Sequence, residues 1–128
     1  KNLIVGTQKA IAAGIKAAKP KATTGDLGAA IEKVLKAHGL GVVKVLSGHG
    51  VGHEVHEEPY VPNYGNPGTG QSLAPGMVIA IEPMATLGSG RVRVLADEYT
   101  YIASDQKLAA HFEHTVLITE KGSEILTQ

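Results

Sequence analysis

Three histidines and three glutamates fall within twelve consecutive positions of this sequence, residues 48–59 (GHGVGHEVHEEP). Imidazole nitrogens and carboxylate oxygens bind divalent ions, and the same groups transfer protons. The interspersed glycines predict a loop in which backbone and ligands approach closely. Each polar side chain alone is equally compatible with a solvated loop, because His and Glu are common surface residues. Their concentration in one stretch favours a chemical role for the stretch as a whole.

Two further carboxylates have apolar neighbours. Glu82 follows the run Met77–Ile81, and Glu113 lies within His111–Ile118. An ionised carboxylate in an apolar strand is costly unless it is paired or binds a metal ion. An outward-facing position on a half-solvated sheet is the alternative for each of them. One histidine and two glutamates from three separate segments can converge on Zn, Mn, Fe(II) or Co.

Three other active-site patterns fit less well. A zincin needs His-Glu-x-x-His on a helix, whereas residues 53–56 (HEVH) are one residue short and lie among glycines. A phosphate-binding loop would need Gly-Lys-Ser/Thr after the glycines, and none follows. Ser47 lacks the Gly-x-Ser-x-Gly turn of a nucleophilic serine.

Two helices are predicted ahead of these residues. The first is expected over Leu3–Ala18, where isoleucines recur at near-helical spacing until Lys19-Pro20 ends the run. The second begins at Thr24 as the N-cap, with Asp26 near the positive end of the helix dipole, and ends at Gly39.

Beyond residue 40 the pattern changes to short β-prone runs separated by Gly, Pro, Asp and Ser. The fold class is therefore predicted to be α+β, with two helices followed by an antiparallel sheet. The stretch Pro59–Pro75, dense in Gly, Pro and Asn, is expected to be a surface loop. The predicted strands are Val42–Leu46, Met77–Ile81, Arg91–Leu95, Tyr99–Ile102 and Phe112–Thr119.

Composition narrows the functional classes. The 128 residues suffice for one domain, residues 1–128, and carry 12 basic and 12 acidic side chains, which argues against nucleic acid and anionic membranes as partners. The absence of cysteine excludes thiolate ligands and agrees with a cytoplasmic location. No apolar run reaches the roughly 20 residues that span a bilayer. The first residue is Lys1 rather than Met, which suggests a fragment or a processed product.

Three motifs in this order resemble those of the methionine aminopeptidases, metallopeptidases of the pita-bread fold, and the resemblance covers nearly the whole chain. It implies half of that fold, the C-terminal half, with two helices packed on a curved antiparallel sheet. It also implies a divalent cofactor, Co, Mn, Fe or Zn, and a peptide or nascent-chain N-terminus as the substrate. The motifs are residues 48–52 leading to 56–59, residues 75–77 with 81–84, and residues 112–115.

The resemblance also implies roles for single residues. His49, Glu82 and Glu113 correspond to metal ligands, and Glu113 to the one that bridges two ions. His56 corresponds to the histidine that contacts the scissile carbonyl and stabilises the tetrahedral intermediate. A ligating glutamate, assigned as Glu82, takes the proton of the attacking water. Val55 and Tyr99 fall where apolar or aromatic side chains line the methionine pocket in relatives, although ordinary packing in a sheet explains them equally well.

One part of the family's metal site has no counterpart in this sequence. Two aspartate ligands of the family come from a β-hairpin in an N-terminal half, and the aspartates present here, Asp26, Asp97 and Asp105, do not match them. We therefore expect the chain to hold one ion. An isolated half of a two-lobed fold also exposes an apolar face, so we expect a homodimer or a complex with a separate N-terminal half.

Two alternatives stay open. Xaa-Pro peptidases share the fold and several motifs, but they usually have Gly where Met84 follows Glu82-Pro83, and Asp where His114 follows Glu113. The other alternative is a catalytically silent half pita-bread domain, whether a fragment, an ancestral form or a design, that assembles as a dimer.

Overall fold

Helices α1 (Asn2–Ala17) and α2 (Thr24–Ala37) lie within one residue of their predicted starts in the computed structural model, which describes residues 1–127. The N-cap of α2 is Thr23, so the prediction of Thr24 was wrong by one residue. The Thr23 hydroxyl accepts a hydrogen bond from the Asp26 N–H, and the Asp26 carboxylate accepts one from the Thr23 N–H at 2.7 Å. This reciprocal capping box satisfies two of the free N–H groups at the helix start. Gly39, with φ of 66°, follows the helix as predicted.

The strands are short, and every pair of them is antiparallel. They form a five-stranded sheet in the order β10-β9-β4-β2-β3, a three-stranded sheet in the order β1-β5-β8, and a β6–β7 hairpin. The bounds are β1 Gly41–Val42, β2 Ser47–Gly50, β3 Glu57–Pro62, β4 Val78–Ile81, β5 Met84–Thr86, β6 Val92–Val94, β7 Tyr101–Ala103, β8 Ala109–His111, β9 His114–Thr119 and β10 Gly122–Ile125.

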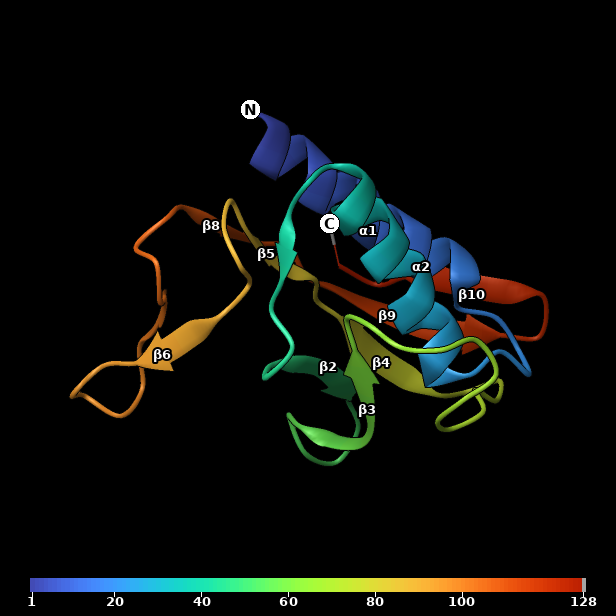
Figure 1. Ribbon diagram of the computed structural model, residues 1–128. Helices are drawn as coiled ribbons and strands as arrows, with labels where there is room; N and C mark the ends of the chain where they lie inside the picture. The colour runs from blue at the N-terminus through green and yellow to red at the C-terminus, as the bar shows by residue number, and fades with distance from the viewer. Residues whose placement is uncertain (128) are drawn as a thin grey trace.

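The two helices lie side by side and cover one face of the sheets (Figure 1), which confirms the predicted α+β architecture. Their apolar stripes meet inward-facing strand residues in one core. Burying one Leu, Ile or Val side chain contributes about 1.5–3 kcal/mol. The helix layer therefore fixes where the strands lie. Fully buried members are Leu27, Ile31 and Leu35 of α2 and Ile79, Ile81, Val116 and Ile118 of β4 and β9.

Several predictions about strands were wrong in part. The predicted strand Val42–Leu46 ends at Val42, and residues 43–46 carry the chain from the three-stranded to the five-stranded sheet. The predicted loop Pro59–Pro75 begins inside a strand, because β3 runs over Glu57–Pro62. Since β3 is an edge strand, it tolerates prolines that would interrupt a central one.

Two chain breaks face each other where the sheets meet. Glu82 and Pro83 separate β4 from β5, and Phe112 and Glu113 separate β8 from β9. The flanking pairs Ile81–His114 and Met84–His111 align the breaks. The strand predicted over Phe112–Thr119 in fact begins at His114, two residues later than predicted. Glu113 therefore lies in a break rather than inside a strand.

No helix among residues 1–127 has the length and apolar character that crossing a membrane requires.

Candidate metal centre

The three side chains predicted to bind a metal ion converge. One ligand atom each from His49, Glu82 and Glu113 lies within 4.8 Å of the other two. His49 comes from β2, Glu82 from the break after β4 and Glu113 from the break before β9. The side chain of His49 is buried, that of Glu82 is 12% exposed, and Glu113 is open to solvent. The group thus extends from the buried His49 to the solvent-exposed Glu113.

His49 lies on an interior strand of the five-stranded sheet. Its strand β2 pairs with β3 on one side and β4 on the other, so the predicted loop at residues 48–50 is in fact a strand. A Cβ at Gly48 would collide with the Ala80 carbonyl oxygen, and a Cβ at Gly50 with that of Glu58. The two glycines are therefore needed because neighbouring backbones approach closely on both sides of His49.

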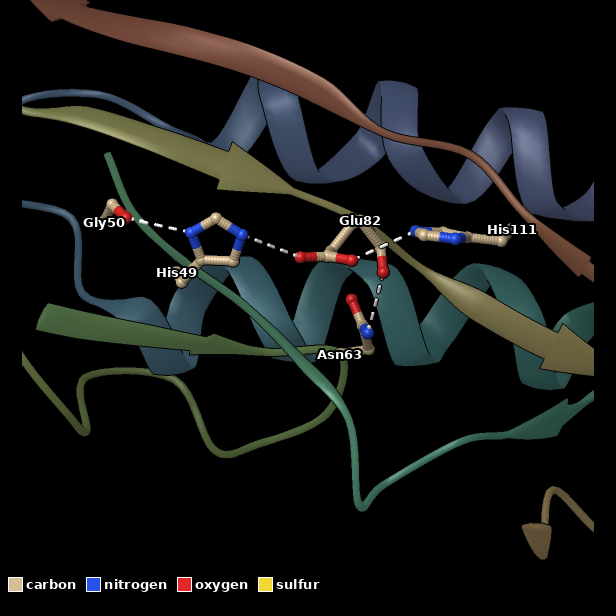
Figure 2. A network of polar contacts seen from close by, with 5 residues as sticks. All are labelled: His49, Gly50, Asn63, Glu82 and His111. Carbon is tan, nitrogen blue, oxygen red and sulfur yellow. Dashed lines mark hydrogen bonds and ion pairs between the residues drawn. The ribbon is translucent and has the colours of Figure 1, made fainter. Parts of the chain in front are cut away.

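The hydrogen bonds of His49 suit a metal ligand. Its Nδ1 lies 2.9 Å from the Gly50 carbonyl oxygen, and a carbonyl only accepts, so Nδ1 carries a proton. In the neutral imidazole the Nε2 lone pair then faces Glu82 Oε1 at 3.3 Å (Figure 2). Two acceptors face one another there, and a cation between them removes their repulsion. A backbone carbonyl that accepts from the second ring nitrogen is the usual support of a ligating histidine. The donor set therefore fits a divalent ion.

Asn63 holds the main chain at Glu82. Its Nδ2 donates to the Glu82 carbonyl oxygen at 3.1 Å, and the side chain is fully buried (Figure 2). Glu82 lies in the break after β4, outside the strand ladder, so its carbonyl needs another hydrogen-bond partner. Oδ1 of Asn63 has no hydrogen-bond partner among the described residues. Asn63 could not be found from the sequence, because nothing in a Pro-Asn-Tyr stretch indicates a buried contact 19 residues away.

His111 is a second residue that sequence analysis did not assign to the site. Its Nε2 lies 3.1 Å from Oε2 of Glu82, on the side away from His49 (Figure 2). The hydrogen bond with Glu82 raises the pKa of the His111 imidazole, and the charges of Glu82 and Glu113 act in the same direction. No pattern in the sequence points to His111, because its place beside Glu82 follows from the antiparallel pairing of Met84 with His111 in the folded chain.

His56, predicted to be catalytic, lies beside His49, one of the three candidate ligands. Its ring centroid is 4.1 Å from that of His49, with the two planes at 50°. It belongs to the exposed segment between β2 and β3, so it can reach a bound molecule from the solvent side.

Val55 and Tyr99, predicted to line a substrate pocket, are 74% and 85% exposed. An open pocket of about 280 Å³ does lie next to the site, with His111 in its wall. Its lining consists of other residues, largely apolar ones from β5, β8 and the β6–β7 hairpin, including Met84 and Tyr101.

The aspartates are occupied by local hydrogen bonds. Those from the Thr23 and Gly68 main chain lower the pKa of Asp26. Bonds from the side chain and main chain of Thr100 lower the pKa of Asp97, and bonds from the main chain of Lys107 and Ser89 lower that of Asp105. Each aspartate therefore caps a helix or a turn. None belongs to the one His and Glu group that residues 1–127 place within reach of an ion.

Comparison with known proteins gives consistent matches. The sequence profile of Metallopeptidase family M24 matches residues 1–120. Methionine aminopeptidase B of Synechocystis sp. is 46% identical over 127 residues, which are 99% of this chain and 46% of that protein. The chain spans about half the length of the curated relatives that it matches.

Solved structures agree. The methionine aminopeptidase of Thermotoga maritima superposes with a TM-score of 0.95 at 46% identity, over 98% of this chain and 51% of that one. A prolidase from Pyrococcus furiosus superposes with a TM-score of 0.73 at 32% identity, over 98% and 32% of the two chains.

Proposed function

Because the chain belongs to Metallopeptidase family M24, we propose that it supplies one side of the metal site of an aminopeptidase that removes methionine from peptide N-termini. The observation that carries the proposal is the convergence of His49, Glu82 and Glu113, which brings their ligand atoms within 4.8 Å of one another. The 46% identity to methionine aminopeptidases supports the choice of substrate.

The three residues would hold one divalent ion, Co, Mn, Fe or Zn, through one imidazole nitrogen and carboxylate oxygens. A bound ion would act as a Lewis acid on the scissile carbonyl and would lower the pKa of a water molecule beside it. Glu113, the most exposed of the three, is the ligand that a second ion would share.

Two residues of this chain would take part in the reaction directly. Glu82 would accept the proton of the attacking water, since its carboxylate lies at the centre of the polar network. His56 would donate a hydrogen bond to the developing oxyanion, since its ring lies beside His49 and is open to solvent. Val55 and Tyr99 would contact the methionine side chain, and their exposure leaves them free to do so.

The rest of the site would come from a separate N-terminal half, or from a second copy of the chain. The coverage of about half of each relative supports this view, as do exposed apolar side chains such as Val45, Val55, Tyr99 and Leu108. Residues 1–128 would form a single domain of the assembly. The cytoplasmic location stays a prediction.

Peptide hydrolysis tests this function. Alone, the metal-supplied chain should cleave Met-Ala-Ser far more slowly than in a complex with an N-terminal half that carries the two aspartates, because loss of one preorganised charge or donor costs about 10² to 10³ in rate. Glu82→Ala should abolish the restored turnover. Full activity of the chain alone would contradict the division of the site between two halves.

An Xaa-Pro peptidase is the second candidate, supported by the prolidase superposition. Met84 and His114 favour the methionine enzyme, as does the higher TM-score of 0.95. Hydrolysis of Ala-Pro peptides in preference to Met-Ala peptides would reverse the choice. If a complex that binds metal hydrolyses neither Ala-Pro nor Met-Ala peptides, the chain is a catalytically silent half-domain.

A further inference from the structure

The two carboxylate oxygens of Glu82 face two different histidines. Oε1 lies 3.3 Å from Nε2 of His49, and Oε2 lies 3.1 Å from Nε2 of His111 (Figure 2). The three residues therefore form a line with the glutamate in the middle. His49 and Glu82 belong to the group whose ligand atoms lie within 4.8 Å of one another, and His111 is not in that group.

The position of His111 is fixed by the sheet. It is the last residue of β8 and pairs with Met84 of β5, immediately beyond the two facing breaks. Its imidazole thus reaches Glu82 from a hydrogen-bonded strand rather than from a mobile loop. Its side chain is 47% exposed, so replacing it leaves the buried core unchanged.

A carboxylate that binds an ion through one oxygen can still rotate about its last side-chain bond. A donor on the other oxygen removes that freedom and keeps the ligating oxygen directed at the ion. Outer residues that hold ligands in this way typically contribute 10- to 100-fold in metal affinity.

We propose that His111 is a positioning residue for the metal centre: its Nε2–H donates to Oε2 of Glu82 and thereby holds Oε1 toward the ion. The inference rests on the proposed metal site. It assigns a role to a residue outside the ligand set, and it predicts that an N–H donor at position 111 is required for tight metal binding although the donor never contacts the ion.

Calorimetric titration with Co(II) tests the requirement for a donor. His111→Leu removes the N–H and should weaken binding 10- to 100-fold. His111→Gln keeps an N–H at comparable reach and should bind within a few-fold of the unchanged chain. His53→Leu, in the exposed segment between β2 and β3, is the matched control and should have no effect. Circular dichroism and melting curves of the metal-free variants should coincide, because His111 is half-exposed.

Proton NMR of the Co(II)-loaded chain separates positioning from direct ligation. A ligating imidazole gives a strongly shifted, exchangeable N–H signal, and one such signal is expected, from Nδ1 of His49. The signal should persist in His111→Gln. A second shifted signal that disappears in His111→Gln would make His111 a ligand and overturn the proposal.

Failure of the inference is distinguishable from failure of the metal site. If the chain binds Co(II) and His49→Ala does not, while His111→Leu binds as tightly as the unchanged chain, His111 has no positioning role and the site itself stands. If His111→Gln is as weak as His111→Leu, the hydrogen bond is not what matters, and the proposal is again wrong. A chain that binds no Co(II) at all contradicts both.

Discussion

Glu82 is the residue on which the polar network depends. Its carboxylate faces His49 and His111, and its main-chain carbonyl accepts from Asn63 (Figure 2). The backbone bond of His49 Nδ1 fixes the tautomer that leaves Nε2 free for an ion. The hydrogen bonds that His111 and Asn63 make to Glu82, and that His49 Nδ1 makes to Gly50, each restrain a ligand rather than add one. The site can therefore hold its geometry before the ion arrives.

His56 provides a prediction about catalysis that is separate from metal binding. In the complete assembly, His56→Ala should lower kcat by about 10² to 10³ while leaving metal affinity unchanged, since His56 lies beside His49 without belonging to the ligand group. The measurement is Met-Ala-Ser hydrolysis together with calorimetric metal titration. His53→Ala, a histidine three residues away in the same exposed segment, is the control. Equal effects of the two substitutions would remove His56 from the mechanism.

Among the secondary-structure elements, two facing breaks create the site, one between β4 and β5 and the other between β8 and β9. A regular strand would send successive side chains to opposite faces, so Glu82 and Glu113 could lie on either face of a continuous sheet. The breaks at residues 82–83 and 112–113 release both from that alternation and bring them toward His49. The helices share the buried core with these strands and hold them in place (Figure 1).

Asn63 should be required for this arrangement. Asn63→Ala leaves the Glu82 carbonyl without its partner, and an unsatisfied buried group costs about 1–3 kcal/mol. Urea unfolding should show that loss of stability. Metal affinity should also fall, because the Glu82 main chain is no longer held by a hydrogen bond. Asn66→Ala, at an exposed position in the following loop, is the control. Unchanged unfolding free energy and metal affinity in Asn63→Ala would mean that the break at residues 82–83 keeps its conformation without the Asn63 hydrogen bond.

The capping box of α2 gives a prediction about pH. Main-chain hydrogen bonds hold the pKa of Asp26 below its unfolded value of about 3.9. A lowered folded pKa means that the stabilisation is present above that value and is lost as the pH falls through the folded pKa. The difference in urea midpoint between the unchanged chain and Asp26→Ala should therefore shrink below about pH 4. A difference that stays constant from pH 6 to strongly acidic solution would contradict this.

Thr23→Ala should cost about 1 kcal/mol at neutral pH.

Sequence patterns predicted the helices and the chemistry better than the strands. Regular spacing of apolar residues gave both helices within a residue or two, because helix formation is local. Strands β2 and β3 were missed because glycines and prolines stand in them, tolerated only through close neighbours and an edge position. The predicted ligands His49, Glu82 and Glu113 do lie together, whereas His111 and Asn63 depend on pairings between distant segments that a single sequence does not reveal.

At the scale of the whole molecule, one face is covered by helices and other parts stay open. The β6–β7 hairpin extends away from the helices (Figure 1) and carries Tyr99 in its connecting turn, with Val94 and Tyr101 also exposed. Glu113 is solvent-exposed as well. These features suit a surface that packs against another half, with the ion between the two.

We therefore expect the chain to associate. Light scattering should give a mass above 13.3 kDa at micromolar concentration, or a shift to a complex when an N-terminal half is added. A monodisperse species of the chain mass over a wide concentration range, unchanged by the added half, would contradict the proposed partner.

His49, Glu82 and Glu113 are proposed to form a site for one ion in this chain, and the decisive experiment is calorimetric titration of Mn(II) or Co(II) into the metal-free chain. The predicted result is one tightly bound ion per chain, lost in His49→Ala, Glu82→Ala and Glu113→Ala. It should be retained in Glu54→Ala, which removes a carboxylate from the same polar stretch without touching the three ligands. Two tight ions per isolated chain, or equal losses in Glu54→Ala and Glu113→Ala, would contradict the assignment.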